Sequence, residues 1–466
     1  MIGKRARRRK PATVPYDLLV LGGGAAGSIV ARDAAVQGYR VALVQPRERP
    51  GGFLPDRTML VKILLHHANQ WQVMQGAGDN AFPARPTPEQ WERVVGRIRA
   101  TLETVTHQNG AVMPGVEIVQ ESGVFASDRE VLAGKRVLSA LRIVIATGAV
   151  PVSPDFPGHE AISTVHDLLQ LPALPERVVI AGNSAHAAEL GQMLARFGVD
   201  VTMLVPGAFL AREETTLARA LQEALQADGV TFLVQTPIEG VTMSGGTVSV
   251  RVQRRGKPVD LEADALFVDS EPEPNVYTCG LDQAGVQFSE QGIAVSATMA
   301  TSVPHIWACG DVTGIYPLLP VAEYQARLVS HNAFMAGPPR RADYRVVPWS
   351  LLTSPELARV GLTEAEARAG GFDVVAAMVP LLDVPRAKLD GTIAGMVKLV
   401  VDRETHLILG GHILAARASE MIAEIALAMR SQLPVHSIAS TLHAFPAYSS
   451  AVQQAAALVV EQLETR

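Results

Sequence analysis

Three glycines early in the chain have the spacing of a phosphate-binding turn. Gly22, Gly24 and Gly27 follow the apolar run 16–21 and precede a helix-compatible stretch that reaches about Gly38. In such a turn the first glycine permits a tight bend, the second lets the backbone approach a pyrophosphate, and the third lets helix and strand pack closely. The first turn of the helix offers free N–H groups and a positive dipole end to the phosphates. The pattern predicts a dinucleotide-binding turn.

A second apolar strand, Arg40–Val44, completes a βαβ unit and ends at Gln45. A carboxylate usually stands at this place and holds the ribose hydroxyls. Gln45 can still form hydrogen bonds there but carries no charge. The residues expected to contact the dinucleotide in this unit are Gly22, Gly24, Ala25, Ala26, Gly27 and Gln45.

The same unit recurs about 160 residues later, which predicts two nucleotide-binding domains. Arg177–Ala181 is predicted as a strand, a helix should run to about Phe197, and Asp200–Val205 should be the next strand. The expected contacts of the turn between the first strand and the helix are Gly182, Ser184 and Ala187.

This second turn departs from the glycine pattern. Ser184 and Ala187 add Cβ atoms where the backbone should lie closest to a pyrophosphate and to the strand. Val205 stands where an acid would hold a nicotinamide ribose. We therefore expect weaker nucleotide binding here, and the choice between NADH and NADPH stays open.

Two further strands end in residues suited to a ligand. Arg142–Ile145 is predicted as a strand that leads into Ala146, Thr147 and Gly148, and Thr301–Asp311 is predicted as another that ends in Gly310 and Asp311. Ligands of open α/β sheets gather at the carboxyl ends of the strands. Asp311 is therefore placed to meet a polyol chain.

Together these segments resemble the pyridine nucleotide–disulfide oxidoreductase family, which includes dihydrolipoamide dehydrogenase, glutathione reductase, mercuric reductase and the soluble transhydrogenase. The resemblance covers nearly the whole chain from Tyr16. Besides the segments above, it rests on Thr353–Glu356, Val360–Thr363 and Gly410–His412. It implies FAD in the first domain with Asp311 on the ribitol, NADH or NADPH in the second, and a homodimer. It also adds Gly52 and Ala322 to the expected FAD-binding residues.

The expected fold is α/β, with two Rossmann-like nucleotide-binding domains, for FAD and NAD(P), and a C-terminal α+β dimerisation domain. The predicted boundaries are 1–14 for a basic flexible arm, 15–153 and 275–343 for the FAD-binding domain, 154–274 for the NAD(P)-binding-like domain, and 344–466 for the dimerisation domain.

Composition narrows the class of protein. The 466 residues are 48% hydrophobic and 19% charged, which suits a well-cored enzyme and excludes a disordered or fibrous chain. No window of about 18 apolar residues predicts a transmembrane helix. The net charge of −5 gives no reason to expect a nucleic-acid partner. The basic arm lacks a following apolar segment, so we expect no secretory signal and a cytoplasmic location.

Only two cysteines occur, Cys279 and Cys309, which excludes a disulfide-stapled scaffold and a cysteine-rich metal site. His66 and His67 are adjacent on a predicted helix, so their side chains point about 100° apart and no metal site is expected.

The departures from the family concern its sulfur chemistry. The family places a Cys-x4-Cys redox pair after Gly51 and Gly52, but this chain has Phe53 and Thr58 at those positions. Neither side chain can form a disulfide or a thiolate, so dithiol exchange is excluded at that site. The family's C-terminal His-x4-Glu acid–base pair is likewise replaced, by Phe445 and Ser450.

The candidate catalytic residues are Lys62 and Glu189. The resemblance places Lys62 beside the flavin N5 region and makes Glu189 its ion-pair partner. A buried lysine there would stabilise the negative charge of the reduced flavin. Two unrelated surface charges are the alternative.

The resulting hypothesis is an FAD-dependent NAD(P)H oxidoreductase of diaphorase type that reduces a small-molecule, non-disulfide acceptor. Quinones are the leading class, because Phe53, Leu54 and Phe445 would make the former disulfide side apolar. One alternative is a transhydrogenase-like hydride exchange between nicotinamide nucleotides. The other is a catalytically degenerate flavin-binding structural or interaction protein.

Overall fold

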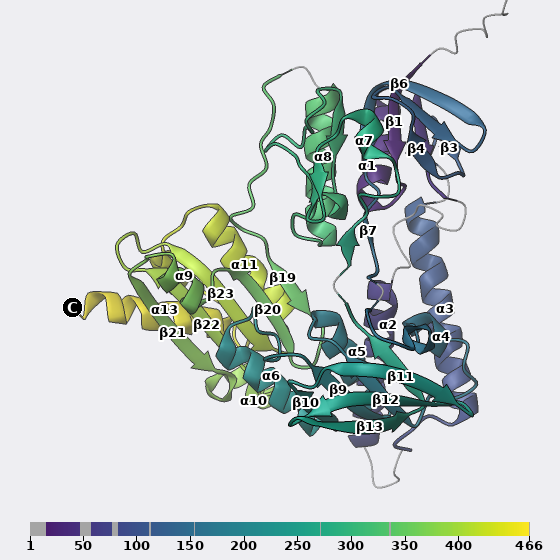
Figure 1. The fold of residues 1–466 in the computed structure, drawn as a ribbon. Helices are drawn as coiled ribbons and strands as arrows, with labels where there is room; N and C mark the ends of the chain where they lie inside the picture. The colour runs from purple at the N-terminus through teal and green to yellow at the C-terminus, as the bar shows by residue number, and fades with distance from the viewer. Residues whose placement is uncertain are drawn as a thin grey trace, which may run out of the picture. The chain divides into compact units, whose positions relative to one another are not determined.

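The computed structural model describes residues 15–46, 57–76, 83–110, 113–152, 154–270, 272–334 and 337–465, with the side chains of 57–58 and 105–110 also left out. The chain divides into two compact units (Figure 1). Unit 1 comprises residues 1–54, 103–152 and 272–343, and unit 2 comprises residues 55–102, 153–271 and 344–466. The basic arm and Gly52 lie outside the described residues, and the four sequence-based boundaries stay predictions.

Unit 1 is built on a seven-stranded sheet in the order β3-β2-β1-β6-β5-β4, with β18 also paired to β6. These strands are β1 (Tyr16–Leu21), β2 (Val41–Val44), β3 (Val116–Val119), β4 (Gly123–Phe125), β5 (Glu130–Ala133), β6 (Arg136–Ile145) and β18 (Ile306–Ala308). Strands β3, β2, β1, β6 and β18 run parallel, whereas β5 and β4 form an antiparallel extension. The remaining elements are α1 (Ala25–Val36), β7 (Ala149–Val150), β15 (Glu273–Pro274), α7 (Leu281–Ala284), β16 (Phe288–Ser289), β17 (Gly292–Ile293), η2 (Asp311–Thr313) and α8 (Leu319–Phe334).

The first strand is apolar throughout because it is buried on both faces, as parallel strands usually are. Leu18 and Val20 pack in one cluster with residues of α1 and α8, which lie against each other in Figure 1. Leu19 and Leu21 point to the other face and pack with Phe125. Strand β1 therefore delivers the glycine turn to a fixed place at the edge of the sheet.

Unit 2 begins with a four-stranded parallel sheet in the order β10-β9-β8-β14 and a three-stranded antiparallel sheet, β11-β12-β13. These strands are β8 (Arg177–Ala181), β9 (Asp200–Val205), β10 (Val230–Val234), β11 (Ile238–Ser244), β12 (Thr247–Arg254), β13 (Lys257–Ala263) and β14 (Ala265–Val268). The helices are α2 (Arg57–Gly76), α3 (Pro88–Gly110, which crosses the boundary between the units), η1 (His159–Ala161), α4 (Val165–Leu168), α5 (Ala185–Arg196) and α6 (Thr215–Ala227). Val178 and Ile180 pack with residues of α2 and α5, while Val179 packs with β12.

The C-terminal part of unit 2 is a five-stranded antiparallel sheet in the order β19-β20-β23-β22-β21. Its strands are β19 (Trp349–Leu351), β20 (Glu356–Gly361), β21 (Val374–Pro380), β22 (Met396–Asp402) and β23 (Ile408–Ala415). Its helices are α9 (Glu364–Ala369), η3 (Leu381–Asp383), α10 (Pro385–Asp390), α11 (Ala418–Arg430), α12 (Val435–Ser440) and α13 (Ser450–Glu464). Helices α11 and α13 lie against the sheet (Figure 1), and their apolar side chains pack with those of its strands. The predicted fold class, two Rossmann-like parts plus a C-terminal α+β part, is confirmed.

The predicted strand Thr301–Asp311 is wrong over most of its length, because only Ile306–Ala308 forms β18. Residues 301–306 form a turn instead. The Thr301 hydroxyl donates to the Ile306 carbonyl at 2.8 Å and accepts from the Val303 amide at 3.1 Å. Pro304 also lacks an amide hydrogen for the ladder.

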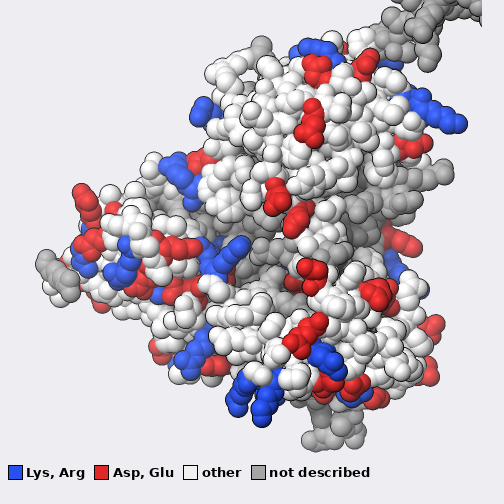
Figure 2. All heavy atoms as spheres, viewed as in Figure 1, with Lys and Arg blue, Asp and Glu red and all other residues white. Residues whose placement is uncertain are grey.

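The surface mixes both signs of charge. On the face that Figure 2 shows, acidic and basic side chains are interspersed. Within the described part of the chain, no helix combines the length and apolarity that a bilayer crossing requires.

A cluster of charged side chains lies inside unit 2, on the segment that precedes α6, on β20 and on α9. Arg359 Nη2 lies 2.7 Å from Glu366 Oε2, but Arg359 Nη1 lies 3.6 Å from Glu213 Oε1. Glu213 Oε2 is buried with no hydrogen-bond partner among the residues that the structure describes. Burial therefore raises the pKa of Glu213 from 4.5 to about 7. Burial also lowers the pKa of His412, in β23, from 6.5 to about 4.

Replacing Glu213 with glutamine is expected to stabilise the protein at pH 8 by up to about 2 kcal/mol and to change little at pH 5. A carboxyl whose folded pKa is raised contributes stability below pH 4.5, and that contribution is lost as the pH rises to about 7. His412 acts in the opposite direction between pH 6.5 and about 4, so the informative quantity is the difference between variant and parent. Denaturant unfolding at both pH values measures it.

The matched control is Glu223→Gln, which removes an exposed carboxylate of α6 paired with Arg219. It should give nearly the same small effect at both pH values. An equal loss of stability by Glu213→Gln at pH 5 and pH 8 would contradict the prediction.

Candidate functional site

The glycine turn of unit 1 has two tightly packed positions and one open position. A Cβ on Gly22, whose φ is 102°, would lie 2.1 Å from the Ala146 carbonyl oxygen. A Cβ on Gly27 would lie 1.9 Å from the Gly22 oxygen. A Cβ on Gly24 would meet no atom of the described residues within 4 Å. The first and third glycines are thus required by packing, and the second borders the open space that a pyrophosphate needs.

The N-terminus of α1 has free capacity for an anion. Gly24 is the N-cap residue and provides no side-chain cap, and the first turn contains no acidic residue. Ala25 and Ala26 follow as its first helical residues. The N–H groups of a first helical turn have no partner inside the helix and attract phosphates.

Gln45 follows β2 at the position of the missing carboxylate. Its side chain is buried at 4% exposure, and its Oε1 atom has no hydrogen-bond partner among the described residues. A buried unsatisfied acceptor costs about 1–3 kcal/mol. A ribose hydroxyl could donate to this atom, so Gln45 fits a dinucleotide in spite of its missing charge.

The other predicted FAD contacts converge around the same sheet edge. Gly148 accepts a hydrogen bond from the Asn275 amide at 2.9 Å, and the Thr147 hydroxyl donates to the Asn275 carbonyl at 3.0 Å. A Cβ on Gly310 would lie 3.3 Å from Ala26 Cβ and 3.8 Å from Ala322 Cβ. Asp311 follows directly, half-buried at the start of η2.

These observations in unit 1 fit FAD. The open Gly24 position and the uncapped α1 would hold the pyrophosphate, Gln45 the adenosine ribose, and Asp311 the ribitol. The roles of the individual residues stay predictions.

The corresponding turn of unit 2 is arranged differently. Ser184 is the N-cap residue of α5, and its hydroxyl oxygen accepts from the amides of His186 at 3.0 Å and Ala187 at 3.3 Å. The same hydroxyl donates to the Asp269 carboxylate. Gly182 packs beside this pair, because a Cβ there would lie 2.7 Å from the Asp269 carbonyl oxygen. Val205 is fully buried, so its side chain is not available to a ribose.

Sequence reasoning missed Asp269. Comparing the residues that follow two equivalent strands, β6 and β14, would have pointed to Asp269. Strand β6 leads into Ala146, Thr147 and Gly148, whereas β14 leads into Asp269 and Ser270. A carboxylate replaces alanine at the first of these positions.

Lys62 and Glu189 form the ion pair that the sequence predicted, inside unit 2. Lys62 Nζ lies 2.9 Å from Glu189 Oε1, with side-chain exposures of 28% and 1%. The same carboxylate oxygen accepts from the Leu352 amide at 2.8 Å. Glu189 Oε2 has no hydrogen-bond partner within the described ranges. A carboxylate this deeply buried depends on its single cation.

Both cysteines are buried in unit 1 and chemically quiet. Burial raises the pKa of Cys279 to about 11 and that of Cys309 to about 12. The thiolate is the reactive form, so neither residue is a nucleophile near neutral pH. Phe53 and the side chain of Thr58 lie outside the described residues.

Three residues of the C-terminal segment, His443, Phe445 and Tyr448, differ in exposure and in contacts. Phe445 is 81% exposed, whereas Tyr448 is 7% exposed and its hydroxyl donates to Asp390 at 2.8 Å. His443 Nε2 lies 2.9 Å from Glu424 Oε1, and its Nδ1 lies 3.0 Å from the Thr441 carbonyl. These contacts hold the side chains of His443 and Tyr448 within the C-terminal part.

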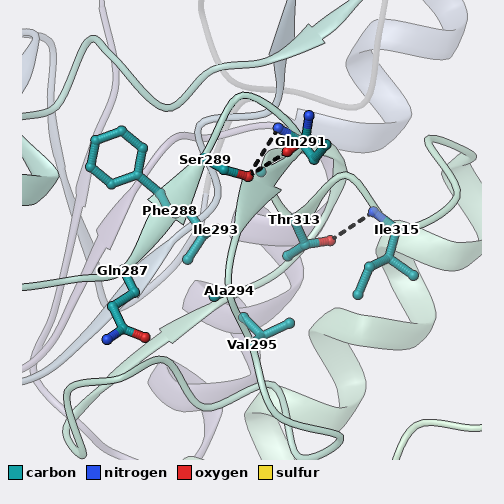
Figure 3. Close-up of a pocket in the computed structure, with 10 residues that line it drawn as sticks. Gln287, Phe288, Ser289, Gln291, Ile293, Ala294, Val295, Thr313 and Ile315 are labelled. Carbon is teal, nitrogen blue, oxygen red and sulfur yellow. Dashed lines mark hydrogen bonds between the residues drawn. The ribbon is translucent and has the colours of Figure 1, made fainter.

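Unit 1 also contains a cavity of about 400 Å³, beside the β16–β17 hairpin. Figure 3 shows its mixed lining, in which Phe288, Ile293 and Ile315 are apolar and Gln287 and Thr313 are polar. None of the predicted cofactor contacts lines it.

The chain matches known proteins over nearly its whole length. Residues 16–326 match the pyridine nucleotide-disulphide oxidoreductase family, and residues 347–456 match its dimerisation domain. The chain is 29% identical to a mercuric reductase of Staphylococcus aureus, over 91% of this chain and 78% of that protein. It is 30% identical to a dihydrolipoyl dehydrogenase of Mycobacterium tuberculosis, over 94% of this chain and 97% of that protein.

Among solved structures, the HOCl-induced flavoprotein disulfide reductase RclA from Escherichia coli superposes with a TM-score of 0.83 at 25% identity. The match covers 95% of this chain and all of that one. The glycine turn of unit 1, the second nucleotide-binding fold and the C-terminal sheet are thus parts of one known arrangement. The chain belongs to the pyridine nucleotide-disulphide oxidoreductase family, whose members are FAD-containing enzymes that use NAD(P)H.

Proposed function

We propose that this chain is an FAD-dependent NAD(P)H oxidoreductase that passes electrons to a small non-disulfide acceptor, with quinones as the leading class. The observation that carries the proposal is the position and burial of the two cysteines. These residues stand far in sequence from the family's redox pair, and both are buried with strongly raised pKa values. No dithiol is available to relay electrons to a disulfide substrate.

Bound FAD would supply two-electron transfer between the nicotinamide and the acceptor. In this proposal the residues of unit 1 hold the cofactor through its phosphates and ribose. By the resemblance to the family, Lys62 would supply a positive charge that stabilises the reduced cofactor, and its ion-pair partner Glu189 would compensate that charge. Without a dithiol to protonate, the family's histidine and glutamate have no task, which agrees with their replacement by Phe445 and Ser450.

A homodimer is part of the proposal. The C-terminal part matches a dimerisation domain, and it exposes the apolar side chains of Leu442 and Phe445. Such side chains are usually covered by a partner. A cytoplasmic location also belongs to the proposal, because the nicotinamide nucleotides are cytoplasmic metabolites.

Anaerobic titration of the purified, FAD-loaded protein with NADH and NADPH tests the proposal. At least one nucleotide should bleach the visible flavin absorbance, and a quinone should restore it. The matched control is the double variant Cys279→Ala, Cys309→Ala, which should turn over quinone at the parent rate. Failure of both nucleotides to bleach the flavin would refute the proposal.

A non-catalytic flavin protein is the second candidate, and one observation favours it. The amides of α5 that would receive a nucleotide pyrophosphate already have Ser184 as their partner. FAD retention combined with no binding of either nucleotide would select this candidate. Exchange of hydride between NADPH and an NAD analogue would instead indicate the transhydrogenase-like reaction.

A further inference from the structure

We infer that Asp269 is an internal competitor for the nucleotide pyrophosphate and sets the affinity of unit 2 for NAD(P)H. The inference rests on the part of the proposed function that assigns a nicotinamide nucleotide to this unit. Asp269 would then determine the affinity at that site, and weak nucleotide binding would be caused by a residue of the chain itself.

The position of Asp269 follows from the sheet. Strand β14 pairs in parallel with β8, and the Asp269 amide continues this ladder by donating to the Ala181 carbonyl at 2.8 Å. Asp269 therefore stands beside Gly182, where the backbone turns toward α5. This is the carboxyl edge of a parallel sheet, where nucleotides bind in such folds.

The carboxylate reaches the helix end through one side chain. It accepts a hydrogen bond from the Ser184 hydroxyl, whose oxygen in turn accepts from the His186 and Ala187 amides. The α5 N-terminus is thus already connected, through Ser184, to the Asp269 carboxylate. A helix N-terminus stabilises an anion of either origin, a side chain of the protein or a phosphate of a ligand.

The turn of unit 1 provides the internal comparison. There the N-cap residue is Gly24, which provides no side-chain cap to α1, and no atom within the described ranges lies within 4 Å of a Cβ built on it. In unit 2 a pyrophosphate must displace the Ser184 hydroxyl from the amides and approach the Asp269 carboxylate. Two like charges in partly buried surroundings repel strongly, so the same fold binds the two nucleotides with different strengths.

Titration calorimetry of the FAD-loaded protein with NAD⁺, NADP⁺ and ADP-ribose tests the inference. Asp269→Asn keeps the size of the side chain and an acceptor for Ser184 while it removes the charge. We expect roughly tenfold to hundredfold tighter binding of all three ligands, by a similar factor, because all three contain the pyrophosphate. Oxidised ligands make the readout independent of flavin reduction and of turnover.

The matched control is Asp260→Asn, which removes an equally charged side chain of β13 that is paired with Arg251 on the exposed sheet. It should leave the three dissociation constants unchanged. Asp269→Ala serves as a second variant, and thermal unfolding of each variant checks that it is folded.

Unchanged dissociation constants in both Asp269 variants would overturn the inference, as would absence of binding in parent and variants alike. A gain confined to NAD⁺ or NADP⁺, without ADP-ribose, would also overturn it, because the effect would then not act on the pyrophosphate. Binding that appears only in the variants supports it. The proposed function fails separately, if flavin reduction is absent in a variant that binds nucleotide tightly.

Discussion

Replacing Gly24 with valine is expected to weaken FAD binding by at least about a hundredfold while the apoprotein stays folded. A Cβ at this position meets no atom of the described part of the chain within 4 Å, and the residue has an ordinary φ of −67°, so the backbone there accepts a side chain. The added methyl groups would occupy the space that the pyrophosphate needs. Loss of the preferred glycine N-cap should cost the apoprotein only about 1 kcal/mol.

The measurement compares apoproteins, because bound FAD would itself stabilise the parent. The FAD content after purification, reconstitution titrations and thermal unfolding of the cofactor-free forms give the three quantities. The matched control is Gly27→Val, where the new Cβ would lie 1.9 Å from the Gly22 oxygen and 3.1 Å from Val20 Cγ1. That variant should fail to fold, whereas a Gly24→Val protein that retains FAD would contradict the assigned site.

The sequence predicted the elements whose signal is local. Strand β1 occupies the predicted run 16–21, and β8 and β9 match their predicted ranges, because continuous apolar runs beside a glycine turn leave little choice. Helix α5 ends at Arg196, one residue before its predicted end at about Phe197. The segment 301–305 was misjudged because its hydrogen bonds depend on a threonine turn, which apolar periodicity does not report.

The sequence predicted site residues that a local motif identifies. It did not predict contacts between residues that are far apart in the chain. The spacing of the three unit 1 glycines predicted their separate tasks. The structure gives packing reasons for Gly22 and Gly27, and the task of Gly24 stays a prediction. The role of Ser184 as a helix cap and its bond to Asp269 join residues 85 positions apart. No spacing rule connects two such residues, so only the parallel pairing of β14 with β8 brings them together.

The contrast between the two turns bears on how the chain differs from its disulfide-reducing relatives. Unit 1 keeps an open and uncapped helix end, together with an unsatisfied buried acceptor at Gln45. In unit 2 the hydroxyl oxygen of Ser184 already accepts from two amides at the equivalent helix end. The missing Cys-x4-Cys pair and the capped second nucleotide turn are two separate differences from the family pattern.

Replacing Lys62 with methionine is expected to destabilise the protein by about 2–4 kcal/mol, and adding Glu189→Gln should restore most of that loss. Methionine removes the cation but leaves the Glu189 carboxylate at 1% exposure, with the Leu352 amide as its remaining donor. A buried charge without its counter-charge is costly, whereas a neutral amide of the same shape is not. Glutamine also keeps an oxygen for the Leu352 amide. Denaturant unfolding of the parent, the two single variants and the double variant completes the cycle.

The two single variants should differ, and this asymmetry identifies the cause. Lys62 is 28% exposed, so after Glu189→Gln its ammonium group can be hydrated, and the loss should be smaller than for Lys62→Met. The matched surface control is Arg251→Met, because the partner of Arg251, Asp260, is 46% exposed. This variant should lose less than about 1 kcal/mol of stability. A Lys62→Met protein as stable as the parent, or a double variant no better than Lys62→Met, would show that burial of Glu189 does not depend on the lysine.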